Sequence, residues 1–197
     1  GTCSDGLYVM FTSGTTGEPK GALVSHKAVA RLCDEQFFLS LSSDDCMLHA
    51  APLGFDASTL ELWAPLLAGG SIAVWDGASA DLLGLAECVA RSKCTVAWLT
   101  SALFQAAVDG VPSIFDRLEV LLTGGDVVSA SHVETVLKRN PALIVVNGYG
   151  PTENTVFTSC DVITASGRPQ GDHLSIGRPI RGTTVRILGR NGECLPL

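Results

Sequence analysis

Residues 7–21 read Leu-Tyr-Val-Met-Phe-Thr-Ser-Gly-Thr-Thr-Gly-Glu-Pro-Lys-Gly, an apolar run followed directly by a loop rich in hydroxyl groups and glycine. The hydroxyls supply neutral hydrogen-bond donors, and glycines let backbone N–H groups approach an anion closely. Lys20 adds a positive charge on a flexible stem that suits a phosphate oxygen. The loop is not a Walker A motif, because Pro19 occupies a glycine position, and it is not GxGxxG, because two residues separate Gly14 from Gly17. We interpret it as a polyphosphate cradle rather than a flexible connector.

Strand-like and helix-like segments alternate over the following residues. Two capping-box pairs, Ser58 with Glu61 and Ser131 with Glu134, are expected to begin helices. In chain order the pattern predicts a strand at 7–11, helices at 27–39 and 58–68, a strand at 71–75, a helix at 82–92, a strand at 95–100, a helix at 102–108, a strand at 118–123, a helix at 131–140 and a strand at 142–146. Strands alternating with helices of about 10 residues predict an α/β fold, with a mainly parallel sheet flanked by helices on both faces.

The alternation of strand-like and helix-like segments ends after Glu153. Residues 183–188 alternate in polarity, and Asn191-Gly192 is typical of a hairpin turn. We expect residues 1–174 to form a partial core and residues 175–197 to begin a β subdomain that continues beyond the chain.

Composition excludes several classes of protein. The chain has 197 residues, of which 46% are hydrophobic and 17% charged, so it can bury a core and is too apolar for intrinsic disorder. A net charge of −7 disfavours nucleic acid as a partner. The longest stretches without charge, 62–75 and 94–108, are shorter than the roughly 18–20 residues of a membrane span. We therefore expect no nucleic-acid partner and no membrane partner.

The cysteines and histidines do not predict a metal site. The 7 cysteines are scattered without a CxxC pair, and the 4 histidines lie far apart. We interpret the cysteines as buried or incidental thiols in a reducing compartment, which predicts a cytoplasmic location.

Four segments together resemble the adenylate-forming (AMP-binding) superfamily, which includes adenylation domains of non-ribosomal peptide synthetases, acyl- and aryl-CoA ligases and luciferases. Residues 8–21 resemble its signature loop. Further along, Gly-Phe-Asp-Ala-Ser-Thr-Leu-Glu-Leu-Trp at 54–63, Asn-Gly-Tyr-Gly-Pro-Thr-Glu-Asn-Thr at 147–155 and Ser-Ile-Gly-Arg-Pro-Ile at 175–180 match later motifs in the right order. The resemblance covers essentially the whole chain and is strongest to the peptide-synthetase adenylation domains.

The resemblance implies that ATP activates a carboxylate as an adenylate, with release of pyrophosphate. Catalytic roles fall to Lys20 on the β- and γ-phosphates, Thr152 on the α-phosphate and Glu153 as the ligand of Mg²⁺, a hard cation that prefers oxygen. Tyr149 would stack on adenine, and Asn147 would bond its exocyclic amine. The implied ATP-binding residues are Thr12, Ser13, Gly14, Thr15, Thr16, Gly17, Lys20, Gly124, Gly125, Asn147, Tyr149 and Thr152. Segments 12–20 and 147–153 should therefore converge on one ATP molecule.

Asp56 separates the branches of the superfamily. In the peptide-synthetase branch an aspartate at this place binds the α-ammonium group of an amino acid, which needs a fixed counter-charge once it leaves water. Asp56 could instead cap the following helix, but Ser58 can serve as that cap. We therefore favour an amino-acid substrate over the acid substrate of an acyl- or aryl-CoA ligase.

The side-chain pocket can also be carried over from the resemblance. Its implied substrate-binding residues are Asp56, Ala57, Leu60, Trp98, Leu122, Gly124, Gly148, Val156 and Phe157. Beyond Asp56 this lining carries no charge and, apart from the indole N–H, no polar side chain. A polar substrate side chain would lose water without gaining a partner, so we predict an aliphatic amino acid, valine or a similar branched residue first.

The resemblance further implies transfer of the aminoacyl group to the phosphopantetheine thiol of a separate carrier protein domain. The chain lacks the ribose-binding Thr-Gly-Asp motif and the lysine-bearing C-terminal subdomain of the family. We therefore expect a central fragment of an adenylation domain that is poorly active alone. The alternatives are an acyl- or aryl-CoA ligase of the same superfamily and a nucleotide-binding remnant without chemistry.

Overall fold

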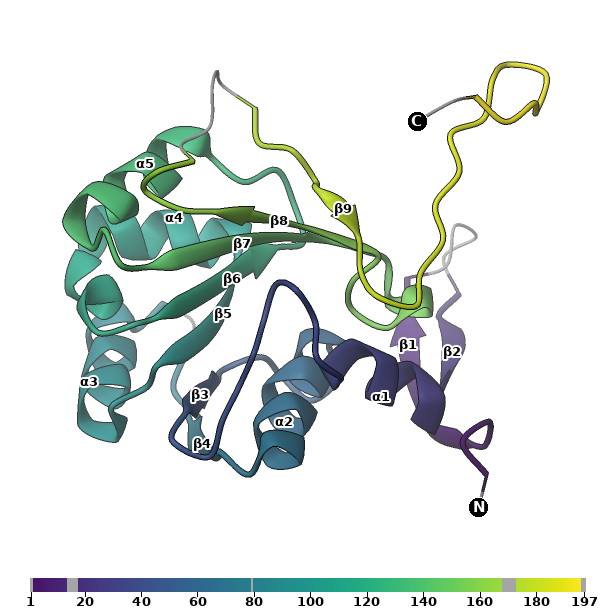
Figure 1. Ribbon diagram of the computed structural model, residues 1–197. Helices are drawn as coiled ribbons and strands as arrows, with labels where there is room; N and C mark the ends of the chain where they lie inside the picture. Colours follow the sequence, from purple (N-terminus) through teal and green to yellow (C-terminus); the bar gives the residue numbers. More distant parts are fainter. Residues whose placement is uncertain (1, 14–17, 79, 168–172, 196–197) are drawn as a thin grey trace.

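A computed structural model describes residues 2–13, 18–78, 80–167 and 173–195 (Figure 1). Its main sheet has seven strands in the order β4-β3-β5-β6-β7-β8-β9. These are β3 (Cys46–His49), β4 (Ser71–Val74), β5 (Val96–Thr100), β6 (Val120–Gly124), β7 (Ile144–Tyr149), β8 (Ser159–Ile163) and β9 (Arg178–Pro179). Pairing is parallel from β4 to β7, and β8 and β9 are added antiparallel. The predicted α/β fold with a mainly parallel sheet is confirmed.

Helices α2 to α5 lie between successive parallel strands, as the alternating pattern predicts, whereas α1 follows the hairpin strand β2 (Lys20–Ser25). The helices are α1 (His26–Cys33), α2 (Ala57–Ala68), α3 (Leu82–Ser92), α4 (Ser101–Gly110) and α5 (Ala130–Arg139), with short 3₁₀ helices η1 (Pro112–Asp116) and η2 (Thr152–Asn154). The helix predicted at 82–92 is confirmed to the residue. Asp81 begins it by accepting a hydrogen bond from the Gly84 N–H at 2.9 Å, and Lys93 ends it in a left-handed conformation.

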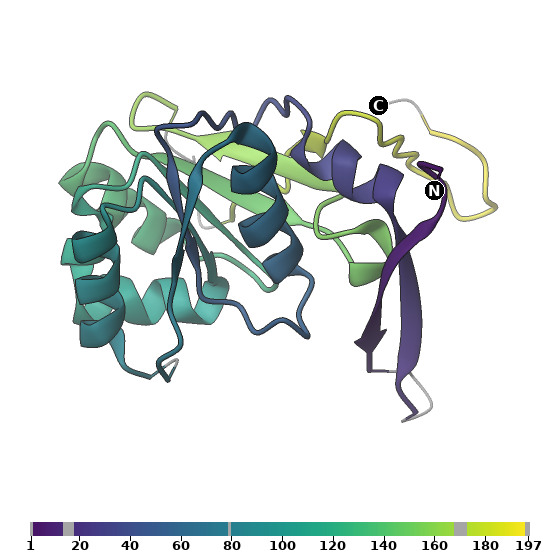
Figure 2. The same cartoon turned by 90° about the horizontal axis from the view of Figure 1, so that it is seen from below.

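The first predicted strand lies outside the main sheet. β1 (Gly6–Thr12) and β2 (Lys20–Ser25) form a separate antiparallel hairpin that projects from the molecule (Figures 1 and 2). Met10 and Val24 are buried, whereas Phe11 and Leu23 are 69% and 70% exposed. The strand predicted at residues 7–11 is confirmed as part of β1, but it pairs with β2 in the hairpin and not with the main sheet.

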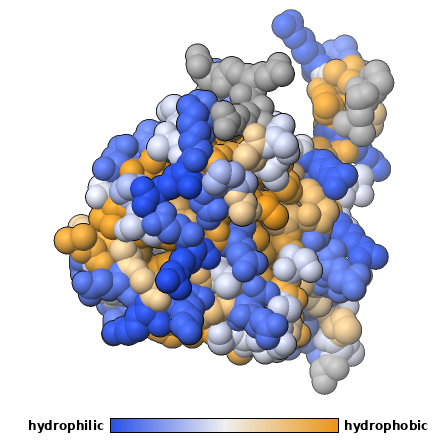
Figure 3. Space-filling view, turned by 60° about the vertical axis from the view of Figure 1, so that its left-hand side comes forward, coloured by the Kyte–Doolittle hydropathy of each residue, from blue (hydrophilic) through white to orange (hydrophobic). Residues whose placement is uncertain are grey.

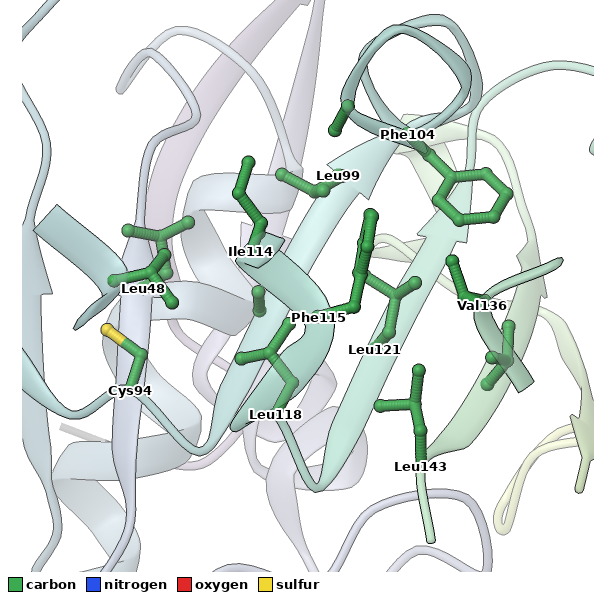
Figure 4. Packing of buried hydrophobic residues seen from close by; sticks show 14 of the residues in the cluster. Leu48, Cys94, Leu99, Phe104, Ile114, Phe115, Leu118, Leu121, Val136 and Leu143 are labelled. Atoms are coloured by element: carbon green, nitrogen blue, oxygen red, sulfur yellow. The ribbon is translucent and has the colours of Figure 1, made fainter. Parts of the chain in front are cut away.

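Two hydrophobic clusters cover opposite faces of the sheet. The larger cluster joins the sheet to α3, α4, η1 and α5 (Figure 4), and the smaller one joins it to α1 and α2. Adjacent residues of β6 show the alternation, because Leu121 belongs to the larger cluster and Leu122 to the smaller. On the surface, hydrophilic side chains cover much of the face shown in Figure 3, with hydrophobic atoms exposed between them.

Both predicted capping boxes are wrong. α2 begins at Ala57, and the Ser58 hydroxyl donates to the Phe55 carbonyl at 2.7 Å instead of capping the helix. The Glu61 carboxylate faces the loop before α2, where it accepts from the backbone N–H of Ala51 at 3.0 Å. Both side chains therefore bond to the segment before α2 instead of capping the helix.

In α5, the Ser131 hydroxyl lies 3.0 Å from the Ser129 hydroxyl, and Glu134 pairs with Lys138 at 2.8 Å, one turn further along. The helix begins at Ala130, and Ser129 takes the cap position without a side-chain cap bond. The Glu134–Lys138 ion pair supports the exposed face of the helix.

The helix predicted at 27–39 is shorter than expected. α1 ends at Cys33, and Glu35 has a positive φ of 31°. Gln36 turns back, donating from Nε2 to the Arg31 carbonyl at 2.5 Å and accepting from the Arg181 N–H at 2.9 Å. A long-range contact to the C-terminal segment therefore replaces the last turns of the expected helix.

The C-terminal segment confirms the turn but not an extended strand. Gly192 has a φ of 83° in a narrow hairpin, where Leu188 and Cys194 form an isolated antiparallel bridge. Apart from Leu188, residues 183–188 join no strand in the described part of the chain. β9 extends the main sheet and Ile180 is buried in the smaller cluster, while the boundary between residues 174 and 175 stays a prediction.

The cysteines behave as small core or surface residues. All of them are free thiols, with Cys46, Cys88, Cys94 and Cys160 buried. Burial raises the pKa of Cys33 and of Cys94 to about 12, so both thiols are protonated and unreactive near neutral pH. Within the described ranges, no three His, Cys, Asp or Glu side chains cluster as metal ligands, and no helix has the length and apolarity to cross a bilayer.

The larger cluster should dominate stability. Phe104 is fully buried and packs edge-to-face on Phe115, with ring centroids 5.8 Å apart. Phe104→Ala should lower the free energy of unfolding, measured by urea denaturation, by about 3–5 kcal/mol because it empties a packed site. The matched control Phe11→Ala removes the same side chain from an exposed position and should cost about 0.5 kcal/mol or less. Equal losses in the two variants would contradict this view of the core.

Candidate active site

The loops that follow the parallel strands meet at one edge of the sheet. β3, β5, β6 and β7 run parallel, so their carboxyl ends lie at the same edge, where α/β folds commonly bind ligands. Asp56 follows β3, and Thr152 follows β7. The Thr152 hydroxyl donates to Asp56 Oδ2 at 2.7 Å, which joins two predicted site residues across 96 positions of sequence.

Asp56 does not act as a helix cap. It occupies the cap position of α2 with helical backbone angles, and its side chain makes no cap hydrogen bond. The carboxylate therefore keeps one oxygen on Thr152, and its second oxygen is an acceptor for a further donor at the edge of the sheet.

A pocket of about 470 Å³ opens beside the ends of β6 and β7. Three predicted ATP-binding residues line it, namely Gly125, Asn147 and Tyr149. Asn147 donates from Nδ2 to the Ser175 carbonyl at 2.8 Å, which leaves Oδ1 as the acceptor that an adenine amino group requires. Tyr149 is 54% exposed, so its ring can stack on a planar ligand.

Sequence reasoning missed part of this pocket. Gly148, predicted to bind the substrate, and Gly150 of the 147–155 motif also line it, and the lining residues that the sequence did not single out are Asp126, Val127, Val128, His173, Leu174 and Ile176. Residues 173–176 lie directly before or within the segment 175–180, which the sequence marked only as a motif. Its place against β7 follows from the Asn147–Ser175 hydrogen bond, a contact with no local sequence signal.

Different physical constraints require glycine at the two neighbouring positions 124 and 125. Gly124 and Gly148 face each other across β6 and β7, and a Cβ on Gly124 would lie 2.2 Å from the Gly148 carbonyl oxygen. Gly125 has free space around it but a φ of 82°, which side chains rarely adopt. Gly124 thus permits close strand packing, while Gly125 shapes the pocket wall.

The predicted phosphate loop joins β1 to β2 of the hairpin. Thr12 pairs with Lys20, and the Thr12 hydroxyl donates to the Lys20 carbonyl at 3.4 Å. Ser13 and Lys20 are exposed, whereas Gly14, Thr15, Thr16 and Gly17 lie outside the described residues. β2 contacts η2, and the Tyr8 hydroxyl lies 2.6 Å from the Thr59 hydroxyl of α2. The hairpin is therefore anchored beside Thr152 and Asp56, and the shared ATP molecule stays a prediction.

Arg31 fixes η2, which carries Thr152 and Glu153. Its guanidinium donates to the Asn154 carbonyl at 2.6 Å and to the Thr183 hydroxyl. The predicted metal ligand Glu153 is exposed. One carboxylate fits Mg²⁺, which commonly binds one or two carboxylates and completes its shell with water and substrate phosphates.

Two residues after η2 adopt an unusual backbone. Thr155 and Val156 have φ values of 58° and 64°, and both side chains are buried. A β-branched residue in this region is strained, and such strain persists where surrounding contacts over-determine it. This turn places Val156 and Phe157 in the smaller cluster.

The predicted substrate-binding side chains come together. Leu60, Leu122, Val156 and Phe157 belong to the smaller cluster, and Trp98 packs against it. The lining is apolar, as the sequence suggested, although the Trp98 indole Nε1 is buried without a hydrogen-bond partner. Their role in binding a substrate stays a prediction.

The family model of AMP-binding enzymes matches residues 3–197. The chain belongs to the AMP-binding enzyme family. Gramicidin S synthase 2 of Brevibacillus brevis is 37% identical over 194 residues, which make up 98% of this chain and 4% of that protein. Malpibaldin synthetase of Mortierella alpina is 39% identical over 98% of this chain and 4% of that protein.

Solved structures of the AMP-binding family share the fold. Holo-PA1221, described as an NRPS protein containing adenylation and PCP domains, matches with a TM-score of 0.92 and 41% identity, covering 99% of this chain and 34% of that chain. The N-terminal subdomain of Klebsiella oxytoca NpsA, in complex with 3-hydroxybenzoyl-AMSN, matches with a TM-score of 0.87 and 26% identity, over 99% of this chain and 50% of that chain. The fold is that of part of an adenylation domain of a non-ribosomal peptide synthetase (NRPS). The chain spans only 4% of the length of each of the two synthetases named above.

The close packing at Gly148 can be tested directly. An added Cβ would lie 2.2 Å from the Phe157 ring, so Gly148→Ala should force that ring away and cost about 1–3 kcal/mol of unfolding free energy. At Gly167 the nearest atom of the described residues to an added Cβ is 3.7 Å away, so Gly167→Ala should cost about 0.5 kcal/mol or less. Urea denaturation of both variants measures the difference, and a harmless Gly148→Ala would refute the described contact.

Proposed function

We propose that the chain is the central part of an adenylation domain that uses ATP and Mg²⁺ to activate an amino acid as an aminoacyl-adenylate. The observation that carries the proposal is the 2.7 Å contact between Asp56 and Thr152 at the carboxyl edge of the sheet. It puts the residue predicted to hold the substrate's ammonium group beside the residue predicted to hold the α-phosphate. An amino acid bound through its ammonium group would have its carboxylate close to the phosphorus that it must attack.

The chemistry requires two anions to meet. A carboxylate oxygen attacks the α-phosphorus, and the bond to pyrophosphate breaks, so negative charge must be neutralised along the line of attack. Lys20 would neutralise charge on the leaving phosphates, and the Thr152 hydroxyl would donate to the α-phosphate. Glu153 would hold Mg²⁺, which supplies positive charge to the phosphates when bound. The pocket at Asn147 and Tyr149 would fix adenine.

The aminoacyl group would then pass to the phosphopantetheine thiol of a carrier domain. Support comes from PA1221, described as containing both adenylation and PCP domains, and from the identity of this chain to part of Gramicidin S synthase 2. The relatives extend far beyond the matched segment, so the full reaction belongs to a longer assembly of domains.

Replacing Asp56 tests the substrate class. In the complete adenylation domain, Asp56→Ala should lower kcat/KM for amino-acid-dependent ATP–pyrophosphate exchange by about 100-fold or more, because the desolvated ammonium loses its counter-charge. Asp44→Ala, at an exposed position in the loop before β3, makes the same chemical change and should leave exchange within about twofold. Indifference to Asp56→Ala would instead favour an acyl- or aryl-CoA ligase.

The apolar lining predicts the side chain of the substrate. An exchange panel of amino acids should rank valine or another branched aliphatic residue first, with Ser, Asp and Lys at least about tenfold lower in kcat/KM. The reason is that the buried cluster around Leu60, Leu122 and Val156 offers a polar side chain no partner apart from the Trp98 indole N–H, which can only donate. A preference for Asp, Lys or Ser would contradict this assignment.

A further inference from the structure

A buried carboxylate lies behind the predicted ammonium site. Glu61 is on α2, five positions after Asp56, and is 0% exposed. Its Oε2 accepts from the backbone N–H groups of Ala50 and Ala51 at 3.1 and 3.0 Å, and lies 2.7 Å from Nδ1 of His49. An ionised carboxylate can only accept, so the His49 ring is assigned the tautomer with a hydrogen on Nδ1, and one oxygen atom gathers three donors from the end of β3 and the first residues of the following loop.

Burying a carboxylate in this way has a cost that the local fold does not require. The other oxygen, Oε1, is buried without a hydrogen-bond partner. Burial raises the pKa of Glu61, while the hydrogen bonds from Ala51, His49 and Ala50 oppose that rise. An apolar side chain at this position would avoid the desolvation cost, so the carboxylate indicates a requirement to hold the three donors.

The three donors lie at the start of the loop that connects β3 to α2. His49 is the last residue of β3, and Ala50 and Ala51 begin the loop that ends at Asp56. Glu61 thus ties the start of the loop to the helix that begins at its end. Asp56 is fixed by the helix on one side and contacts Thr152 on the other.

We propose that Glu61 and His49 form a positioning pair that holds the β3–α2 loop, and with it Asp56, where the α-ammonium group of the substrate binds. Neither residue contacts the substrate; both act through the backbone. The inference rests on the proposed function, since it assigns Asp56 to an ammonium group. It predicts that loss of the pair weakens amino-acid binding while leaving the adenine pocket, on β6 and β7, intact.

The test measures exchange kinetics of the complete adenylation domain with both substrates varied. In Glu61→Gln, an amide replaces the carboxylate in the same volume, but its NH₂ group is buried without an acceptor. The KM for the amino acid should rise about tenfold or more, because small misplacements of a binding group are costly, while the KM for ATP should stay within about twofold. Glu134→Gln makes the same change on α5, where the carboxylate pairs with Lys138 at the surface, and should leave both KM values unchanged.

A second variant keeps the inference testable if Glu61→Gln does not fold. His49→Ala removes one donor and leaves both backbone hydrogen bonds, so it should raise the amino-acid KM in the same direction by a smaller factor. Equal rises in both KM values, or a fall in kcat alone, in folded enzyme would overturn the inference and indicate general destabilisation. An unchanged amino-acid KM in both variants would also overturn it.

The Asp56→Ala variant separates this inference from the proposed function. If Asp56→Ala abolishes amino-acid activation and folded Glu61→Gln behaves as wild type, only the positioning role fails. If Asp56→Ala has no effect, the amino-acid function itself fails, and the positioning role fails with it.

Discussion

The hydrogen bond from Thr152 to Asp56 is the contact on which the site depends, because it joins loops that belong to distant parts of the sequence. Parallel strands make it possible. β3 and β7 run in the same direction in the parallel part of the sheet, so the loops that follow them emerge at one edge. The same edge presents Gly125 and Tyr149, and the hairpin carrying Lys20 contacts η2. Charged and polar groups therefore gather where strand backbones end.

Arg31 links this edge to the C-terminal segment. It donates both to η2 and to Thr183, and Gln36 reinforces the link by accepting from the Arg181 N–H. Burial lowers the pKa of Arg31, but a guanidinium remains charged at neutral pH even so. A displacement of the C-terminal segment would thus be transmitted to Thr152 and Glu153 through one side chain.

Much of this arrangement follows from the sequence. Helix α3 and the parallel strands have strong periodic patterns, and the motif loops lie directly after apolar runs, so their convergence could be predicted. The capping boxes could not, because Ser58 and Glu61 serve the loop before α2, and that contact depends on packing between β3 and α2. The early end of α1 likewise depends on Gln36 reaching Arg181, which lies 145 positions away. Local patterns specify elements, whereas long-range side-chain contacts decide how those elements end.

The predicted lining of the substrate pocket lies on one face of the sheet, and the larger hydrophobic cluster lies on the other. The larger cluster is filled by side chains such as Phe104 and Phe115, which include none of the predicted site residues, and its packing needs only volume and shape. The smaller cluster contains Leu60, Leu122 and Phe157, which are the predicted lining of the substrate pocket. Leu60 follows Asp56 by about one turn of α2, so an apolar side chain could enter this cluster while the ammonium group stays at the polar edge. On the proposed function, side chains of the smaller cluster could change to suit another amino acid while the larger cluster preserves the sheet.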